Sequence, residues 1–284
     1  MNIIVSPNLS KKDAYSCAVA VIKKLRELGA DVFMDNSLKK SFEDEDVSFG
    51  SFNDMVNNCD IVAAIGGDGT ILKCASKMIE SKAELLGINT GTLGFMASME
   101  KDELNNLERL FNKNYKISER MLLKAEIKSD DGKVHSYHAL NDIVVTGMYA
   151  KIVDFDVLVN DHLIGSYRAD GAVFATPTGS TAYSLSAGGP VIEPELECME
   201  MNLICPHSLY SRPMIYTDDK VITVVHHSPE ETNVYFSVDG NEPKKLFNGE
   251  KLIIKKSQYK IKLIDMSGVS FYDALNQKLS RSLK

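Results

Sequence analysis

A carboxylate lies inside a run of glycines in the first third of the chain. Asp68 is flanked by Gly66, Gly67 and Gly69, and Thr70 follows. Residues without a Cβ atom let a phosphate approach the backbone, whose N–H groups can bind it. An acid beside a phosphate is repelled unless it has a task, such as accepting a proton or facing a metal ion that the phosphate carries. We therefore interpret Asp68 as the group that takes a proton from an attacking hydroxyl.

A second glycine turn follows the next apolar segment. It starts at Asn89, ends at Phe95 and contains Gly91 and Gly94. Neither turn has the spacing of the common dinucleotide fingerprint or of the P-loop. In an open α/β sheet we expect both turns at the carboxyl ends of strands, where ligands bind. The alternative is that both segments are ordinary tight turns that bind no ligand. Because two such turns occur together, we favour ligand binding over this alternative.

The densest polar segment of the chain spans residues 176–186. It combines hydroxyl side chains with one aromatic ring, Tyr183, between an apolar strand-like run and a short helical one. This combination favours a site in which a base stacks on Tyr183 and hydrogen bonds to Thr181, Ser186 and nearby backbone. A linker is the alternative.

Asn141 and Asp142 place an amide beside a carboxylate within a strand-like run. Neighbouring residues of a regular strand face opposite ways, so the backbone must bend or end there if both are to touch one ligand. The pair suits two vicinal ribose hydroxyls, because it can donate one hydrogen bond and accept the other. An exposed strand end is the alternative.

Other polar residues favour structural roles. The segment from 36 to 51 is polar, and its acidic run 43–46 lacks the ligand spacing and turn glycine of a calcium loop, so we expect a mobile loop. Cys205 stands near His207 without an identifiable acid or base partner, so a nucleophilic thiol is disfavoured. Four histidines are interpreted as strand surface residues rather than metal ligands: His135, His138, His226 and His227. No dedicated metal site is expected.

The composition is that of an ordinary globular protein. The 284 residues are 44% hydrophobic and 25% charged, enough for two domains. A net charge of −7 argues against broad binding to nucleic acid, which needs basic surface. The first residues lack a signal-peptide pattern, no apolar run approaches a membrane span, and the five cysteines are scattered. We therefore expect a cytoplasmic protein that binds neither nucleic acid nor membrane.

Alternating strand-like and helical patterns predict an α/β N-terminal domain with a parallel sheet. Its strands are expected over 2–5, 30–34, 61–65 and 85–88. A helix capped by Asp13 is expected to end at Gly29. Two further helices are expected, one opening at Thr70 and one over 101–114.

Near residue 116 the apolar pattern changes to period two, which predicts a mostly antiparallel C-terminal domain. Strands are expected over 121–128, 139–146, 152–160, 173–176, 201–205, 220–226, 232–238, 251–255 and 259–264. Asp131-Gly132 and Asp239-Gly240 are expected to be hairpin turns. The predicted domains are therefore 1–116, 117–264 and a helical tail, 265–284, that packs back on the first domain.

At these motifs the chain resembles the NAD kinase family of bacterial type. Its signatures occur here in the family's order: residues 66–70 (GGDGT), 89–95, 141–142, 170–171, 176–190, 206–213 and 239–240. The resemblance implies a β-sandwich-like second domain and transfer of the γ-phosphoryl group of ATP, with Mg²⁺, to the 2′-hydroxyl of the adenosine ribose of NAD, giving NADP. Some relatives use polyphosphate, and the family is usually dimeric or tetrameric, so a homodimer or homotetramer is expected.

The resemblance also implies roles for single residues. Asp68 is the base near the hydroxyl, Asn141 and Asp142 hold the ribose, and Asp170 contacts the nicotinamide end. Four residues surround the adenine: Thr181, Ala182, Tyr183 and Ser186. Five more stand where relatives often place contacts: Lys73, Lys151, Arg168, Cys205 and Asn241.

Two departures from the family pattern matter. Asp142 replaces a glutamate, so the acid reaches one methylene less far. Relatives often carry a cation a few residues after Val145, whereas here the next one is Lys151. The source of one phosphate-binding charge is therefore open.

Two other functions stay open at this point. A lipid or sugar kinase would share the GGDGT turn, but it has no use for residues 176–186, and no basic or apolar stretch suited to a membrane is present. A non-catalytic NAD-binding sensor is the other alternative, and the presence of Asp68 argues against it.

Overall fold

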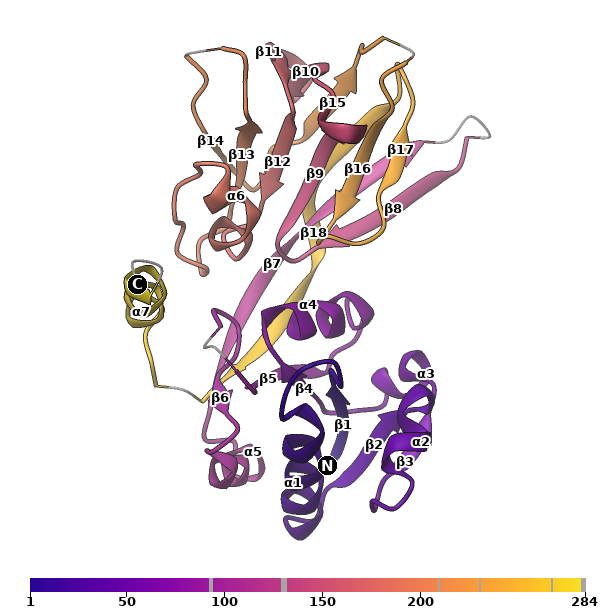
Figure 1. The fold of residues 1–284 in the computed structure, drawn as a ribbon, viewed down its shortest axis with the longest axis vertical. Coiled ribbons are helices and arrows are strands. Elements are labelled where there is room, and N and C mark those ends of the chain that lie inside the picture. The colour runs from indigo at the N-terminus through magenta and orange to yellow at the C-terminus, as the bar shows by residue number, and fades with distance from the viewer. Residues whose placement is uncertain (92–93, 129–131, 209, 230, 267, 282–284) are drawn as a thin grey trace. The chain divides into compact units, whose positions relative to one another are not determined.

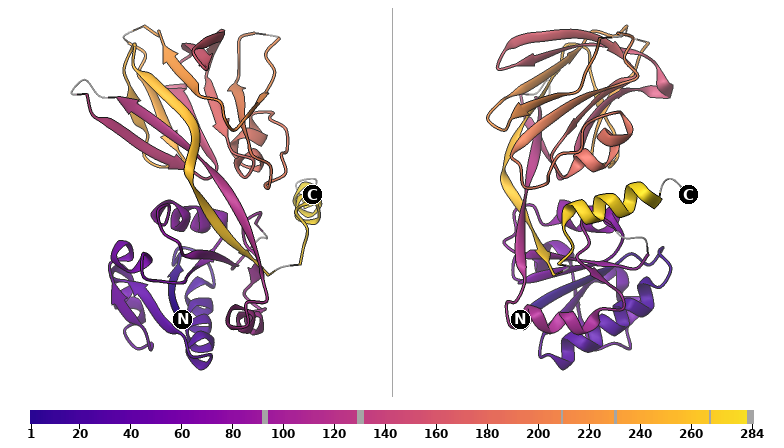
Figure 2. Two further views of the ribbon diagram at one scale, coloured as in Figure 1. Left: turned by 180° about the vertical axis from the view of Figure 1, so that it is seen from behind. Right: turned by 90° about the vertical axis from the view of Figure 1, so that its left-hand side faces the viewer.

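The computed structural model describes residues 1–284 except 92–93, 129–131, 209, 230, 267 and 282–284. The chain forms two compact units (Figures 1 and 2). Unit 1 comprises Met1–Glu119 and Ile261–Lys284, and unit 2 comprises Arg120–Lys260. Each unit has its own cluster of buried apolar side chains. The domain limits at 116 and 264 stay a prediction about independently folding parts.

Unit 1 contains a parallel sheet with the strand order β18-β5-β4-β1-β2-β3, and β6 also pairs with β5. Its strands are β1 (Asn2–Pro7), β2 (Asp31–Asp35), β3 (Ser48–Gly50), β4 (Ile61–Gly66), β5 (Glu84–Asn89), β6 (Met99–Glu100) and the end of β18 (Lys251–Asp265). All six residues of β4 are buried, as expected for a central parallel strand covered on both faces. The predicted α/β class is therefore confirmed.

The helices of unit 1 include the long α1 and α4 and several short turns. They are α1 (Ala14–Glu27), η1 (Asn36–Leu38), α2 (Lys39–Phe42), α3 (Phe52–Val56), α4 (Asp68–Lys77), η2 (Leu104–Leu107), α5 (Glu108–Phe111) and α7 (Phe271–Arg281). The single helix predicted over 101–114 is wrong, because that segment forms two short helices, η2 and α5. Asp13 is the N-cap residue of α1 as predicted, but its carboxylate makes no cap hydrogen bond and pairs with Lys101 at 2.8 Å instead.

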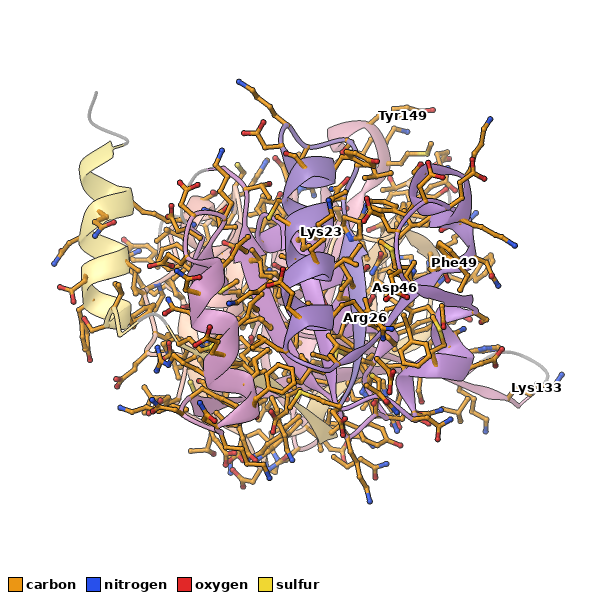
Figure 3. The ribbon with its side chains drawn as sticks, turned by 90° about the horizontal axis from the view of Figure 1, so that it is seen from below. Lys23, Arg26, Asp46, Phe49, Lys133 and Tyr149 are labelled. Carbon is orange, nitrogen blue, oxygen red and sulfur yellow. The ribbon has the colours of Figure 1, made fainter. Side chains whose placement is uncertain are left out.

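The mobile loop predicted over residues 36–51 is wrong as well. That segment contains η1, α2 and β3, because Phe42 is buried in the core of unit 1. The Asp35 carboxylate accepts hydrogen bonds from the backbone N–H groups of Ser37 and Phe52. Asp46, in the acidic run, lies 2.7 Å from Arg26 (Figure 3). The polar composition of residues 36–51 therefore did not indicate that the segment is ordered.

Unit 2 contains two antiparallel sheets that share one core, so the predicted β-sandwich-like class is confirmed. One sheet has the order β14-β13-β12-β9-β16-β17, and the other has β11-β10-β15-β18 together with the β7–β8 pair. The strands are β7 (Lys116–Lys128), β8 (Val134–Ala139), β9 (Asp142–Gly147), β10 (Val153–Val159), β11 (His162–Ala169), β12 (Gly171–Ala175), β13 (Cys198–Ile204), β14 (Met214–Thr217), β15 (Ile222–His226), β16 (Val234–Val238) and β17 (Lys244–Leu246).

Several details of unit 2 differ from expectation. The run 139–146 is interrupted between β8 and β9, which gives the break expected at Asn141. Strands β8, β11, β14 and β17 were not predicted, and 251–264 belongs to one strand, β18. His226 is buried rather than on the surface, and its Nε2 lies 2.9 Å from the Leu246 carbonyl oxygen. Asp239 and Gly240 form a turn with positive φ at both residues, whereas Asp131 lies outside the described residues.

None of the helices in the described part of the chain combines the length and apolar character needed to cross a membrane.

Candidate active site

The GGDGT segment forms a strand–turn–helix junction in unit 1. Strand β4 ends at Gly66, Gly67 is the N-cap residue, and α4 begins at Asp68. At Gly66, φ is +157° and a Cβ atom would lie 2.3 Å from Thr70 Oγ1, so only glycine fits. A Cβ atom at Gly67 or Gly69 would meet nothing within 4 Å. The helix N-terminus therefore faces open space, where an anion can reach backbone N–H groups.

The second glycine turn surrounds the carboxylate of Asp68. Strands β4 and β5 are parallel neighbours with Gly66 opposite Asn89, which confirms that both turns lie at the same sheet edge. Asp68 Oδ2 accepts a hydrogen bond from the Phe95 N–H at 2.9 Å, and Oδ1 accepts one from the Met96 N–H at 3.2 Å. The side chain stays 29% exposed. Asp68 is thus oriented by the protein and still accessible to a ligand.

Two of the polar residues near these turns, Asn89 and Asn8, hydrogen bond to the turns themselves, whereas a third is exposed. Asn89 binds its own turn, because both its side-chain atoms bond the backbone of Gly91 at 3.1 Å. Asn8, which the sequence reasoning missed, donates to Thr70 Oγ1 at 3.3 Å. Lys73 is exposed on α4, one turn after Asp68. Thr92 and Leu93 of the second motif lie outside the described residues.

In unit 2, the Asn141–Asp142 pair and the polar segment that starts at Thr176 lie together. Asp142 pairs with Ala175 across β9 and β12. The Thr176 N–H donates to the Asn141 carbonyl oxygen at 2.9 Å, and its Oγ1 donates to the Leu140 carbonyl oxygen at 2.5 Å. A Cβ atom at position 179 would lie 2.0 Å from the Asn141 carbonyl oxygen, so this close approach requires Gly179. The predicted ribose residues therefore lie against the start of the predicted base-binding segment.

Two acids, the buried Asp142 and the half-buried Asp239, meet at the start of β9. The side chain of Asp142 is buried, and burial together with the nearby charge of Asp239 raises its pKa to about 7. The Asp239 carboxylate accepts hydrogen bonds from the N–H groups of Leu140, Asn141 and Asp142 at 2.8, 2.8 and 3.1 Å. Burial raises the pKa of Asp239 too, although these three donors oppose the shift. Asp239 therefore sets the backbone at Asn141, a role that its turn motif did not indicate.

Tyr183 opens the short helix α6 (Tyr183–Ser186), which follows η4 (Gly179–Thr181). Tyr183 is 44% exposed, so its ring is available for stacking. Behind it, the buried Ser184 Oγ donates to Glu200 Oε1 at 2.7 Å, and Asn202 Nδ2 donates to the Ser184 carbonyl oxygen at 3.2 Å. Glu200 is fully buried, and burial raises its pKa. Sequence reasoning missed this polar support, because Glu200 and Asn202 lie in an apolar strand.

Asp170 stands at the other end of β12 from Thr176. The six residue steps between them correspond to about 20 Å. The Asp170 N–H donates to the Ile204 carbonyl oxygen at 3.0 Å, and the exposed Cys205 follows Ile204. A ligand that reaches both ends of β12 must therefore be long and extended.

Most of the remaining predicted contact residues have protein partners. Arg168 Nη1 lies 3.7 Å from Asp154 Oδ2, Lys151 Nζ donates to the Glu231 carbonyl oxygen at 3.2 Å, and Asn241 Nδ2 donates to the Val238 carbonyl oxygen at 2.9 Å. Thr181 donates to its own helix, Ala182 is half-buried and Ser186 is exposed. Leu209, in the 206–213 signature, lies outside the described residues.

Family models cover most of the chain. The ATP-NAD kinase N-terminal domain matches residues 1–115, and the ATP-NAD kinase C-terminal domain matches residues 140–266. The chain belongs to the NAD kinase family. NAD kinases are enzymes that phosphorylate NAD to NADP, so the resemblance seen in the motifs is confirmed.

Individual relatives agree with this assignment to the NAD kinase family. The chain is 36% identical over 280 residues to an NAD kinase of Natranaerobius thermophilus, covering 96% of each chain. It is 33% identical to an NAD kinase of Acetivibrio thermocellus, covering 98% of this chain and 97% of the relative.

Two solved NAD(H) kinase structures share the fold. Yeast NADH kinase complexed with NADH superposes with a TM-score of 0.90 at 26% identity, covering 99% of this chain and 87% of that one. An NAD kinase from Archaeoglobus fulgidus in complex with ATP gives a TM-score of 0.78 at 25% identity, covering 99% of both chains.

Proposed function

We propose that this protein phosphorylates NAD through Asp68, which acts as general base toward the 2′-hydroxyl of the adenosine ribose. The hydroxyl proton passes to the Asp68 carboxylate while the hydroxyl oxygen bonds to the γ-phosphorus of ATP. The bond from that phosphorus to the β,γ-bridging oxygen breaks, and its electron pair stays on the departing ADP. The observation that carries the proposal is a carboxylate fixed by two N–H donors inside a phosphate-binding turn.

The residues of unit 2 supply binding of the acceptor in this proposal. Asn141 and Asp142 hold the ribose hydroxyls, and Tyr183 stacks on the adenine with help from Thr181, Ala182 and Ser186. Asp170 contacts the nicotinamide end. The length of β12 supports this division, because its two ends match the two ends of an extended dinucleotide.

Mg²⁺ belongs to this proposal as a companion of ATP. Within the described residues, no group of three or more His, Cys, Asp or Glu side chains is placed to hold a metal ion. Triphosphate oxygens are the hard ligands that Mg²⁺ prefers, so we propose that it enters with the nucleotide. When bound, it neutralises charge on the β- and γ-phosphates. Activity with ATP in excess chelator would contradict this.

Three further attributes are proposed on the family relationship alone. The protein works in the cytoplasm, acts on NAD and ATP without nucleic acid or membrane partners, and forms a homodimer or homotetramer. Sedimentation of the purified chain tests the last of these.

The base assignment is tested with Asp68→Asn. General base catalysis contributes about 10²–10⁴-fold, so we expect NADP formation to fall by that factor, with NAD affinity retained. Asp54→Asn, an exposed acid on α3, is the matched control and should behave as the wild type. Near-wild-type turnover of Asp68→Asn would refute the assignment. A wild-type protein that binds NAD but forms no NADP would instead be a sensor.

A further inference from the structure

A lysine of the C-terminal helix lies against the proposed base. Lys278, on α7, places its Nζ 3.4 Å from Asp68 Oδ2. The same Nζ is 3.9 Å from the centroid of the Phe95 ring, a distance at which a cation is attracted to the ring face. The Phe95 N–H donates to that same carboxylate. Ammonium, ring and carboxylate therefore form one cluster within unit 1.

The first turn of α7 carries a local cap and an aromatic contact with Phe95. Ser270 and Asp273 form a reciprocal cap: Ser270 Oγ accepts from the Asp273 N–H at 3.1 Å and donates to Asp273 Oδ2 at 2.7 Å. The Phe271 ring lies 6.2 Å from the Phe95 ring, centroid to centroid. Phe271 and Lys278 are seven positions apart, so they share one face of the helix. Phe95 is thus contacted twice by the same helix face.

The charge at this place matters for phosphoryl transfer. A carboxylate beside the γ-phosphoryl group raises the negative charge there, and the transition state spreads its own charge over three equatorial oxygens. Positive groups aimed at that charge lower the barrier. The sequence left open the source of one phosphate-binding charge, since no cation follows Val145 before Lys151.

We propose that Lys278 is a catalytic residue of the phosphoryl transfer, whose ammonium offsets the charge of Asp68 and contacts the oxygens of the γ-phosphoryl group as it moves. The proposal rests on the proposed function. Lys278 takes no part in the proton transfer, because the hydroxyl proton goes to Asp68. Helix α7 is therefore part of the active site and not only a covering helix.

If Lys278 served only to stabilise the fold, its removal would have a different effect. Both partners are 29% exposed, and an ion pair of this exposure contributes little to stability because solvent screens it. Removal of the charge should then change the unfolding midpoint slightly and turnover not at all. Measuring turnover and the unfolding midpoint of the same variant therefore distinguishes a catalytic role of Lys278 from a purely structural one.

The test compares Lys278→Met, Lys278→Arg and Gln277→Met with the wild type. Methionine keeps length and apolar contact with Phe95 but removes the charge, so we expect kcat to fall by about 10²-fold or more, with KM for NAD and the unfolding midpoint nearly unchanged. Arginine keeps the charge and should restore most of the rate. Gln277 is the exposed neighbour on α7 and serves as the control.

Chemical rescue gives a second readout. In Lys278→Ala, methylammonium should raise kcat, because it brings a charge with N–H donors into the vacated space. Tetramethylammonium, with equal charge and no N–H, should not. Wild-type kcat in Lys278→Met, or an equal loss in Gln277→Met, would overturn the role of Lys278. Absence of NADP from the wild type would instead overturn the proposed function.

Discussion

The two carboxylates proposed to act on the substrate have opposite surroundings. Asp68 is accessible and held by two N–H donors. Asp142 is 6% exposed, and burial with the charge of Asp239 raises its pKa to about 7. Near neutral pH, Asp142 is therefore present in both forms. The protonated form can donate a hydrogen bond to a ribose hydroxyl, whereas the ionised form can only accept one.

This raised pKa makes a prediction about stability. The folded chain keeps a proton on Asp142 that the unfolded chain releases above the ordinary pKa of 3.8. The contribution of Asp142 to stability is therefore full below pH 4 and is lost as the pH rises to 7. Each pKa unit corresponds to about 1.4 kcal/mol, so the loss is up to about 4 kcal/mol.

Asp142→Asn removes this titration. The free energy of unfolding of the variant relative to the wild type should rise between pH 4 and pH 7 and stay constant above pH 8. Urea unfolding across this range measures it. An identical difference between the two proteins at pH 4 and pH 8 would contradict the buried, neutral acid.

At the scale of elements, the site depends on two glycine turns that approach neighbouring groups closely. A Cβ atom at position 94 would lie 1.9 Å from Asp68 Oδ1, and one at position 179 would lie 2.0 Å from the Asn141 carbonyl oxygen. Each glycine thus allows one polar segment to pack against another. Each turn therefore has room for the group that it contacts, the Asp68 carboxylate or the Asn141 carbonyl oxygen, only because glycine is present.

Gly94→Ala should therefore damage catalysis with little effect on the fold. The new methyl group pushes the Asp68 carboxylate out of position, and a misplacement of about 1 Å costs about 10²-fold in rate. Gly91→Ala is the matched control in the same turn, because a Cβ atom there would meet nothing within 4 Å. Steady-state NADP formation and an unfolding midpoint for each variant measure the effect. Equal kcat in the two variants would refute it.

The sequence predicted those elements whose signal is local. The apolar run of β4 and the glycines after it identify the strand and turn, and period two identifies most strands of unit 2. The rest depends on contacts between distant residues. Asp239 fixes the backbone at Asn141 across 98 positions, and Lys278 reaches Asp68 across 210. No local sequence pattern indicates such long-range contacts. The motifs of the candidate site were therefore predicted, whereas the residues that position them were not.

At the scale of the molecule, the motifs are divided between the units. The glycine turn with Asp68 belongs to unit 1, whereas the residues proposed to bind ribose and base belong to unit 2. The proposed function thus assigns the chemistry and the recognition of the acceptor to different parts of the chain. Changes in unit 2 should alter which acceptor binds without altering the base.

Asp170 provides the test of this division. It lies about 20 Å along β12 from Thr176, so it can meet only the end of NAD far from the adenine. Asp170→Ala should weaken NAD binding, by about tenfold for one lost hydrogen bond to a charged group. It should leave the binding of AMP unchanged, since AMP lacks the nicotinamide half. Tyr183→Ala should weaken both ligands, because both carry the adenine. Calorimetric titration of each variant with NAD and AMP separates the two patterns, and equal losses for both ligands in Asp170→Ala would show that the acceptor does not extend along β12.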